Sequence, residues 1–140
     1  MLPNKIKMKT LKYSQSPYTK QVLKHSKHPK NYGIIKNADG KATTVDQICF
    51  DQTTIYIKVS ADGKKIKDIK FVTGGCPASV ASSSILTVMM KGKPLEKAFK
   101  ITQKDILKEL KALPEYKIHC AALPIAALRA AIEDHKSKKK

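Results

Sequence analysis

The chain has 140 residues, a formal net charge of +17 and a hydrophobic content of 41%. This length predicts one domain, large enough to bury a core and too short for two. No run approaches the roughly 18 apolar residues of a membrane span, and no apolar segment follows the lysine-rich N-terminus, so we expect neither a membrane protein nor a secretory signal peptide.

The positive charge comes almost entirely from lysine. Of the 28 basic residues only Arg129 is arginine, whereas base readout and planar phosphate recognition favour the arginine fork. The lysines are spread along the chain, and no aromatic residues interleave them as a platform for stacking bases. A basic nucleic-acid module stays an alternative, but the composition favours solubility and attraction of acidic partners over specific nucleic-acid binding.

Charge and periodicity divide the chain into three parts. Residues 1–16 are charged and lack periodicity, which predicts a flexible basic N-terminal arm. Residues 17–135 carry the helical and alternating patterns of a single domain. The lysine-rich residues 136–140 are predicted to form a basic C-terminal tail.

The domain is expected to begin with a short amphipathic helix. Ser16 has the character of a helix cap, and Pro17 suits the first helical position. Pro29 ends this helix, whose apolar stripe consists of Tyr18, Val22 and Leu23. The stretch "NYGIIKNADGK" that follows is rich in turn residues and predicts a loop.

After this loop the apolar period changes from helical to alternating. One face of the first predicted strand carries Ile55, Ile57 and Val59. An Asp-Gly turn in "ADGK" follows, and Ile69 and Phe71 continue the apolar face on a return strand. The pattern therefore predicts an antiparallel hairpin.

A third strand is expected upstream in "VDQICF", with the apolar residues Val45, Ile48 and Phe50 and with Cys49 near its end. From Pro77 onward the periodicity is helical. Strands followed by helices indicate an α+β fold, in which a three-stranded antiparallel sheet is covered by helices on one face.

Three helical segments are expected after the sheet. The first begins at Pro77, ends at Gly92 and has an apolar stripe of Ala81, Ile85, Val88 and Met89. The second opens with a capping signal, Thr102 with Asp105, is ended by Pro114 and buries Ile106, Leu107 and Leu110. The last carries, at helical spacing, Ile125, Leu128 and Ile132.

The three cysteines lie far apart in the sequence, at Cys49, Cys76 and Cys120. An odd number of cysteines in a chain without a secretory signal argues against a disulfide framework. Either each is a separate small buried hydrophobe, or the fold gathers three thiolate ligands. Their separations match no zinc-finger template, so the local settings have to decide.

Cys76 is predicted at a helix N-terminus, where unpaired amides and the helix dipole favour a thiolate. Asp51 follows Cys49 by two residues, so both side chains share a face in an extended segment. His119 precedes Cys120. Metal ions with tetrahedral preference take thiolate and imidazole, so the cysteines with Asp51 or His119 make a four-ligand set. Surface, solvated positions are expected for the other histidines, His25, His28 and His135.

Four stretches carry a resemblance to a known family: "YTKQVLKHSKHPKNYG", "GGCPASVASSS", "KGKPLEKAFKI" and "LPEYKIHCAALPIAALRAAIEDHKSKKK". From Tyr18 to the C-terminus the chain resembles the IscU/NifU-type iron-sulfur cluster assembly scaffolds. The resemblance implies the SufE/NifU-like sandwich and a non-enzymatic function. Such a scaffold accepts sulfur and iron, holds a transient [2Fe-2S] cluster and transfers it to an acceptor.

The resemblance also implies roles for individual residues. Cys49 and Asp51 fall on the family's C-G-D motif, Cys76 on its G-C-x-x-x-x-A-S-S-S motif, and His119 with Cys120 on its K-x-H-C motif. The cysteines are then implied to receive sulfur and hold iron, with the aspartate and the histidine as exchangeable fourth ligands. Zinc is implied as the occupant of this site in the cluster-free form.

The sequence departs from the family pattern at four places. Phe50 replaces the glycine of C-G-D, which adds bulk and removes backbone freedom beside Cys49. Pro77 stands where the family commonly has glycine, and Pro124 predicts that the final helix starts late or bends. The segment "LPEYK" replaces the family's L-P-P-V-K, so recognition by a DnaK-type chaperone is less secure.

The implied partners are a cysteine desulfurase, a frataxin-like protein, ferredoxin, a DnaK-type chaperone pair and apo acceptor proteins, with a homodimer left open. The expected compartment is the cytoplasm, or the mitochondrial matrix in a eukaryote. A zinc-binding, SufU-like sulfur acceptor that stimulates a desulfurase is the alternative. The segment between Cys76 and Cys120 has no long insertion, which favours the IscU-like branch.

Overall fold

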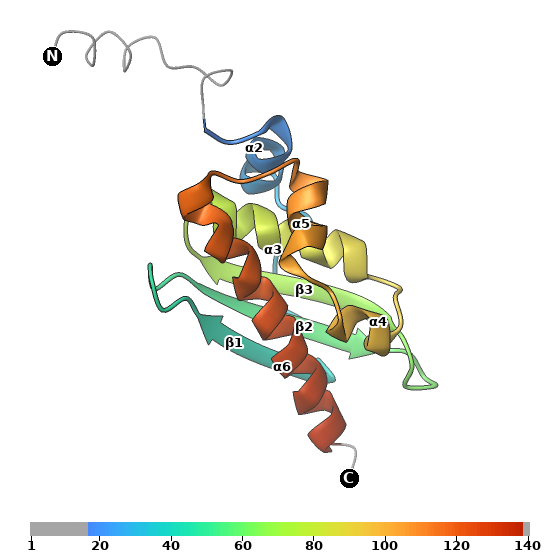
Figure 1. Ribbon diagram of the computed structural model, residues 1–140. Helices are drawn as coiled ribbons and strands as arrows, with labels where there is room; N and C mark the ends of the chain where they lie inside the picture. Colours follow the sequence, from blue (N-terminus) through green and yellow to red (C-terminus); the bar gives the residue numbers. More distant parts are fainter. Residues whose placement is uncertain (1–16, 139–140) are drawn as a thin grey trace, which may run out of the picture.

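The computed structural model describes residues 17–138, so the arm predicted over 1–16 lies outside the described residues. The elements are α2 (Lys20–Lys27), β1 (Gly40–Val45), β2 (Gln52–Val59), β3 (Ile66–Gly74), α3 (Pro77–Met90), α4 (Leu95–Phe99), α5 (Gln103–Leu110), a 3₁₀ helix (Glu115–Ala121) and α6 (Ala122–Lys138). The strands form one antiparallel sheet in the order β1-β2-β3. Helices α3, α5 and α6 lie on one face of this sheet, which confirms the predicted α+β fold (Figure 1).

The predicted hairpin forms the centre of the core. In the register of β2 and β3, Ile55 pairs with Phe71 and Ile57 with Ile69. All four side chains are fully buried beneath the helices, and each such burial contributes about 1.5–3 kcal/mol. Helix α6 packs on β1 and β2, and α3 packs on β3. The alternating pattern therefore fixes which face of the sheet the helices cover.

The third strand lies upstream of its predicted place. It is β1, at residues 40–45, and the segment 46–51 that follows is a turn in which Ile48 and Phe50 are 71% and 75% exposed. The physical reason is Asp46, whose Oδ1 accepts hydrogen bonds from the amides of Ile48 (2.7 Å) and Cys49 (3.2 Å). An aspartate that bonds the amides after it favours a turn over an extended strand. The prediction of a strand over "VDQICF" was wrong.

The first helix begins later than predicted. Its N-cap is Thr19, whose Oγ1 accepts a hydrogen bond from the Val22 amide at 3.1 Å, and Pro17 is not helical. Ser16, the predicted cap, lies outside the described residues. Thr19 also donates to the Leu110 carbonyl at 2.6 Å, which ties α2 to α5. Threonine suits the N-cap because its one hydroxyl accepts a hydrogen bond from a free helix amide and donates one to a neighbouring helix.

Helix α3 begins as predicted, with Cys76 as the N-cap and Pro77 in the first turn. Its apolar stripe was predicted imperfectly, because Val88 is 47% exposed whereas the four serines from Ser79 to Ser84 are all buried. The helix lies between β3, α2, α5 and α6, so nearly its whole circumference is covered. Small side chains allow this close approach on several sides.

The capping box of α5 is present in the structure, with Thr102 and Asp105 bonding each other's backbone amides. The helix ends at Leu110 because Lys111 adopts a left-handed conformation, φ 70°. Pro114, the predicted terminator, lies beyond that end. A left-handed residue is a common way to end a helix.

Pro124 lies in the first turn of α6, where its missing amide costs no helical hydrogen bond. The helix runs to Lys138, so residues 136–138 of the predicted tail are helical, and 139–140 lie outside the described residues. Gly40 lets α6 approach β1, because a Cβ there would collide with the Ala131 carbonyl oxygen. No helix within residues 17–138 has the length and apolar character needed to cross a membrane.

One of the three histidines predicted to be solvated is part of the core. His25 is only 8% exposed, and its Nδ1 is hydrogen-bonded to the Ser84 hydroxyl at 2.7 Å, whereas His28 is exposed and His135 half-buried. Burial, and then the charges of Lys24 and Lys30, lower the pKa of His25. The lysines around it in sequence point outward, and the histidine faces α3.

The burial of His25 predicts a loss of stability in mild acid. Because its pKa is lower in the folded protein than the ordinary 6.5, the unfolded chain binds the proton first. The free energy of unfolding should therefore fall as the pH drops below about 6.5. Urea unfolding of the wild type and of His25→Gln at several pH values measures it. The difference between the two curves isolates His25, and a difference that does not change with pH would contradict the prediction.

Candidate metal centre

Three separate segments bring the predicted site residues to one end of the molecule. The 46–51 turn supplies Cys49 and Asp51, the N-cap of α3 supplies Cys76, and the 3₁₀ helix supplies His119 and Cys120. The sulfur atoms of Cys76 and Cys120 are 3.8 Å apart. All five residues that the motifs singled out are thus gathered by the fold. Their role as ligands stays a prediction.

The donor atoms form two neighbouring groups that share Cys120. Within each group all the donor atoms lie within 4.8 Å of one another. One group consists of Asp51, Cys76 and Cys120, and the other of Asp46, Cys49, His119 and Cys120. Cys120 is fully buried between them, and Cys49 and Cys76 are half-buried. The end of the molecule therefore offers thiolate, carboxylate and imidazole donors around one central sulfur.

Asp51 is tied to the start of α3. Its Oδ2 accepts hydrogen bonds from the Cys76 amide at 3.1 Å and from the Ser79 hydroxyl at 2.8 Å. Burial raises the pKa of Asp51, but these bonds outweigh it and the pKa is lowered overall. Gly75 makes the contact possible, since a Cβ on it would lie 2.7 Å from Asp51 Oδ2. The "GGC" motif thus leaves room for a carboxylate at the helix N-terminus.

The sequence patterns did not identify Asp46. Its Oδ2 lies 2.7 Å from His119 Nδ1, and its side chain is only 8% exposed. Burial raises the pKa of Asp46, but the hydrogen bonds from His119 and from the Ile48 and Cys49 amides lower it overall. Its position three residues before Cys49, as the first residue of a turn, is the only local signal that could have revealed it.

The cysteines differ in acidity. The pKa of Cys76 is lowered to about 5, first by a hydrogen bond from the Cys120 thiol, against the effect of burial, and then by the Ser79 amide and hydroxyl and the Ala78 amide. The pKa of Cys120 is raised, because it keeps the proton that the two sulfurs share. Burial, and then Asp51, raise the pKa of Cys49. The charge on Cys76 raises the pKa of Lys117, which lies on the same side of the site.

Phe50 stands beside Cys49 in a left-handed conformation, φ 62°, and is 75% exposed. That conformation costs a residue with a Cβ about 1–2 kcal/mol relative to glycine. We therefore expect Phe50→Gly to be more stable than Phe50→Ala by about 1 kcal/mol, because both remove the ring and only glycine removes the Cβ. Chemical denaturation of the two variants measures the difference. Equal stabilities would show that the turn stores no such strain.

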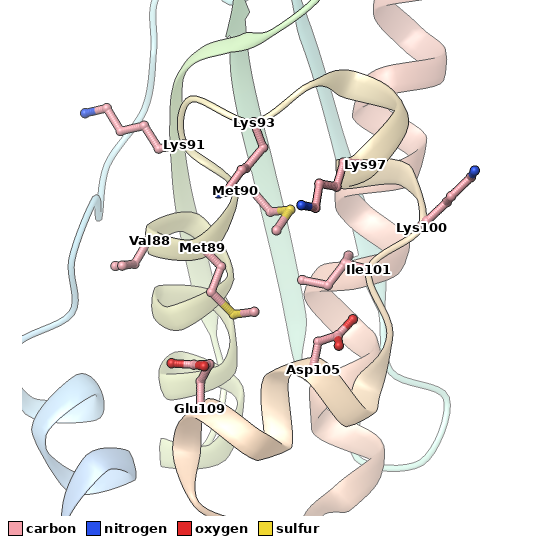
Figure 2. Close-up of a pocket in the computed structure, with 10 residues that line it drawn as sticks. All are labelled: Val88, Met89, Met90, Lys91, Lys93, Lys97, Lys100, Ile101, Asp105 and Glu109. Carbon is pink, nitrogen blue, oxygen red and sulfur yellow. The ribbon is translucent and has the colours of Figure 1, made fainter.

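A large cavity is remote from the sulfur atoms. It has a volume of about 720 Å³ and lies between the C-terminal end of α3, α4 and α5 (Figure 2). Its lining residues are Val88, Met89, Met90, Lys91, Lys93, Lys97, Lys100, Ile101, Asp105 and Glu109. Cys76 lies at the opposite end of α3, about 20 Å away along 14 residues of helix. The cavity therefore contributes nothing to the metal centre.

Comparison with known proteins agrees with the arrangement of these residues. The family model described as NifU-like N terminal domain matches residues 17–140. The iron-sulfur cluster assembly scaffold protein IscU 1 of Archaeoglobus fulgidus is 46% identical over 118 residues, which cover 84% of this chain and 76% of that protein. The IscU scaffold protein of Escherichia coli is 41% identical over 125 residues, 87% of this chain and 96% of that protein.

A solved structure supports the fold independently. The N-terminal NifU-like protein of Brucella abortus superposes with a TM-score of 0.69 at 18% sequence identity, covering 87% of this chain and 96% of that one. At this identity the likeness concerns the fold alone. With a family match over nearly the whole described chain and relatives above 40% identity, the chain belongs to the family of NifU-like N-terminal domains.

Proposed function

We propose that the protein is a non-enzymatic scaffold on which an iron-sulfur cluster, a [2Fe-2S] unit, is assembled and then handed to an acceptor protein. The observation that carries the proposal is the convergence of three cysteines with Asp51 and His119 at one partly open end of the molecule. The names of its IscU relatives support the same role. Iron and sulfide are cargo here, and the protein supplies the donors that hold them.

The donors are suited to temporary binding. Asp51 is hydrogen-bonded to the Cys76 amide and the Ser79 hydroxyl, and His119 to Asp46. When a cluster leaves, these bonds can form again and satisfy the polar groups that are exposed. Oxygen and nitrogen ligands are also weaker partners for iron in such clusters than a fourth thiolate. Both the hydrogen bonds that form again and the weaker ligands lower the free-energy cost of releasing the cluster.

The proposed sulfur donor is the persulfide of a cysteine desulfurase. A thiolate of the site attacks the outer sulfur atom of that persulfide, a new sulfur-sulfur bond forms, the old one breaks, and the desulfurase thiolate leaves. Cys76 is the thiol best prepared for such an attack, since it is partly exposed and ionised at neutral pH. Reduction of the transferred sulfur to sulfide needs two electrons, for which a ferredoxin-type protein is the proposed source.

Anaerobic reconstitution tests the proposal. Protein incubated with a cysteine desulfurase, cysteine, ferrous iron and a reductant should acquire the visible absorption of an iron-sulfur cluster and two acid-labile sulfides for two irons. The variants Cys49→Ser, Cys76→Ser and Cys120→Ser should each lower the yield of cluster strongly. Val88→Ser is the matched control, because this side chain is exposed at the far end of α3. Unchanged absorption in all three cysteine variants would refute the assignment.

A zinc-binding sulfur acceptor that stimulates the desulfurase is the second candidate. The group of Asp51, Cys76 and Cys120 favours it, since two thiolates and a carboxylate within 4.8 Å also suit tetrahedral zinc. Metal analysis separates the two functions. One zinc retained per chain, with no iron or sulfide after reconstitution and with faster desulfurase turnover, would support the acceptor and exclude the scaffold.

A further inference from the structure

We propose that Asp46, Cys49, His119 and Cys120 form a site for a single divalent metal ion, in which Asp46 is a direct ligand. The four donor atoms come from the 46–51 turn and the 3₁₀ helix, and all lie within 4.8 Å of one another. Neither Asp51 nor Cys76 belongs to this group. As the place where iron first binds, the site rests on the proposed scaffold function, but metal binding to it can be measured alone.

The geometry leaves little to adjust. In a tetrahedral site with bonds of about 2.0–2.3 Å, neighbouring donors lie about 3.3–3.8 Å apart. His119 Nδ1 lies 4.0 Å from Cys120 Sγ and 2.7 Å from Asp46 Oδ2. The same nitrogen therefore faces both the sulfur and the carboxylate. A metal ion would replace the proton between Asp46 and His119, move this oxygen and nitrogen apart by about 0.6 Å and draw the sulfurs inward by about 1 Å or less.

The two oxygens of Asp46 have different surroundings. Oδ1 accepts hydrogen bonds from the amides of Ile48 and Cys49, which fix the carboxylate plane, whereas Oδ2 faces His119. Carboxylates that bind metals in proteins usually have their other oxygen hydrogen-bonded, which orients the ligand, and the backbone amides do this for Asp46. Asp51 differs, since its Oδ2 already accepts two hydrogen bonds from the start of α3. Asp46 is thus the carboxylate whose Oδ2 is hydrogen-bonded to the imidazole that would bind the same metal ion.

Burial gives the site an inner and an outer side. Cys120 is fully buried and Asp46 is 8% exposed, whereas His119 is 25% exposed and Cys49 is half-buried. A metal ion can approach past the last two residues. Once bound it would lie beside Cys76, which shares Cys120 as its neighbour at 3.8 Å. Metal and incoming sulfur would then occupy adjacent positions on either side of one thiol.

Cobalt binding to the metal-free protein tests the site without any cluster chemistry. Anaerobic titration with Co²⁺ is followed by the thiolate-to-cobalt absorption, whose intensity grows with the number of cobalt-sulfur bonds. We expect one tetrahedral ion per chain. Cys76→Ser should keep the full intensity, and Cys49→Ser should lose about half of it. A drop of about one third in Cys76→Ser would show a three-thiolate site and overturn the proposal.

Two variants of Asp46 separate a ligand from a purely structural residue. Loss of an outer-shell partner typically weakens metal binding 10–100-fold, so we expect Asp46→Ala to weaken cobalt binding by about 100-fold or more. Asp46→Asn, which keeps an oxygen for the two amides, should weaken it nearly as much. Asp68→Ala is the matched control, because this carboxylate lies on β3 beside Lys91 and belongs to neither donor group, and it should change the affinity by less than about threefold. Wild-type affinity in Asp46→Asn would refute the role of Asp46.

A double variant excludes the alternative that Asp46 only orients His119. If Asp46 binds the metal itself, Asp46→Asn should weaken cobalt binding further in a His119→Ala background, and no further loss would overturn the proposal. The outcome is independent of the proposed function. Failed cluster assembly with the expected cobalt behaviour would refute the scaffold and leave the site standing, and the reverse pattern would refute the site alone.

Discussion

At pH 5.5, iodoacetamide is expected to alkylate Cys76 about 20- to 60-fold faster than Cys49. With a pKa of about 5, roughly three quarters of Cys76 is thiolate at this pH, whereas Cys49, with a pKa raised above 9.0, is ionised to less than about 0.03%. A less basic thiolate is also a weaker nucleophile, and over four pKa units this lowers the intrinsic reactivity of Cys76 about 40- to 100-fold. Dividing the ratio of the two thiolate fractions by this factor gives the expected ratio of alkylation rates. Both cysteines are half-buried, so the reagent can reach each of them.

The pH profile gives the sharper test. The rate at Cys76 should halve near pH 5 and stay flat from about pH 6 upward, because the thiolate is already fully formed. The rate at Cys49 should rise about tenfold per pH unit up to at least pH 9. Timed alkylation followed by mass spectrometry of the peptides measures both. A rate at Cys76 that keeps rising tenfold per unit between pH 6 and 8 would contradict the lowered pKa.

Two substitutions of Cys120 show where the acidity of Cys76 comes from. The hydrogen bond from Cys120 is the largest cause, so Cys120→Ala should shift the Cys76 profile to higher pH. Cys120→Ser keeps a hydroxyl that can donate to the thiolate, and its profile should stay closer to the wild type. If the pH profiles of Cys76 alkylation are the same in the two variants, the low pKa of Cys76 comes from the helix N-terminus alone.

The parts of this fold that the sequence predicts are those with a local physical cause. The alternation of Ile55, Ile57, Ile69 and Phe71 identifies the hairpin, because a strand exposes its two faces in turn. Pro77 marks the start of α3, because proline suits a position without a helical amide bond. The sequence alone therefore predicts that Cys76 lies at a helix N-terminus.

The wrong predictions have a common cause, which is that hydrogen bonds and packing of polar side chains decided the structure at those places. The segment after Val45 alternates as a strand should, yet Asp46 bends it into the turn that carries Cys49. His25 stands among lysines, yet tertiary packing buries it against Ser84. Neither event leaves a periodic signal. For the same reason the motifs identified the ligand candidates but not Asp46, whose partner His119 is 73 residues away.

The two glycines before Cys76 allow the contact between Asp51 and α3 to be measured. A Cβ on Gly75 would lie 2.7 Å from Cγ and Oδ2 of Asp51, whereas one on Gly74 would meet nothing within 4 Å. Gly75→Ala should therefore displace the carboxylate and weaken its bonds to Cys76 and Ser79, each worth about 1.5–3 kcal/mol. We expect a loss of about 2–4 kcal/mol in the free energy of unfolding, and less than about 0.5 kcal/mol for Gly74→Ala.

A double-mutant cycle shows whether this loss acts through Asp51. In an Asp51→Ala background the carboxylate is absent, so adding Gly75→Ala should cost less than about 1 kcal/mol, and the coupling between the two positions should exceed about 1 kcal/mol. Denaturant unfolding of the four proteins measures it. If Gly75→Ala costs the same in both backgrounds, the glycine is required by the backbone alone. The room beside Cys76 would then exist for a reason other than the carboxylate that fills it.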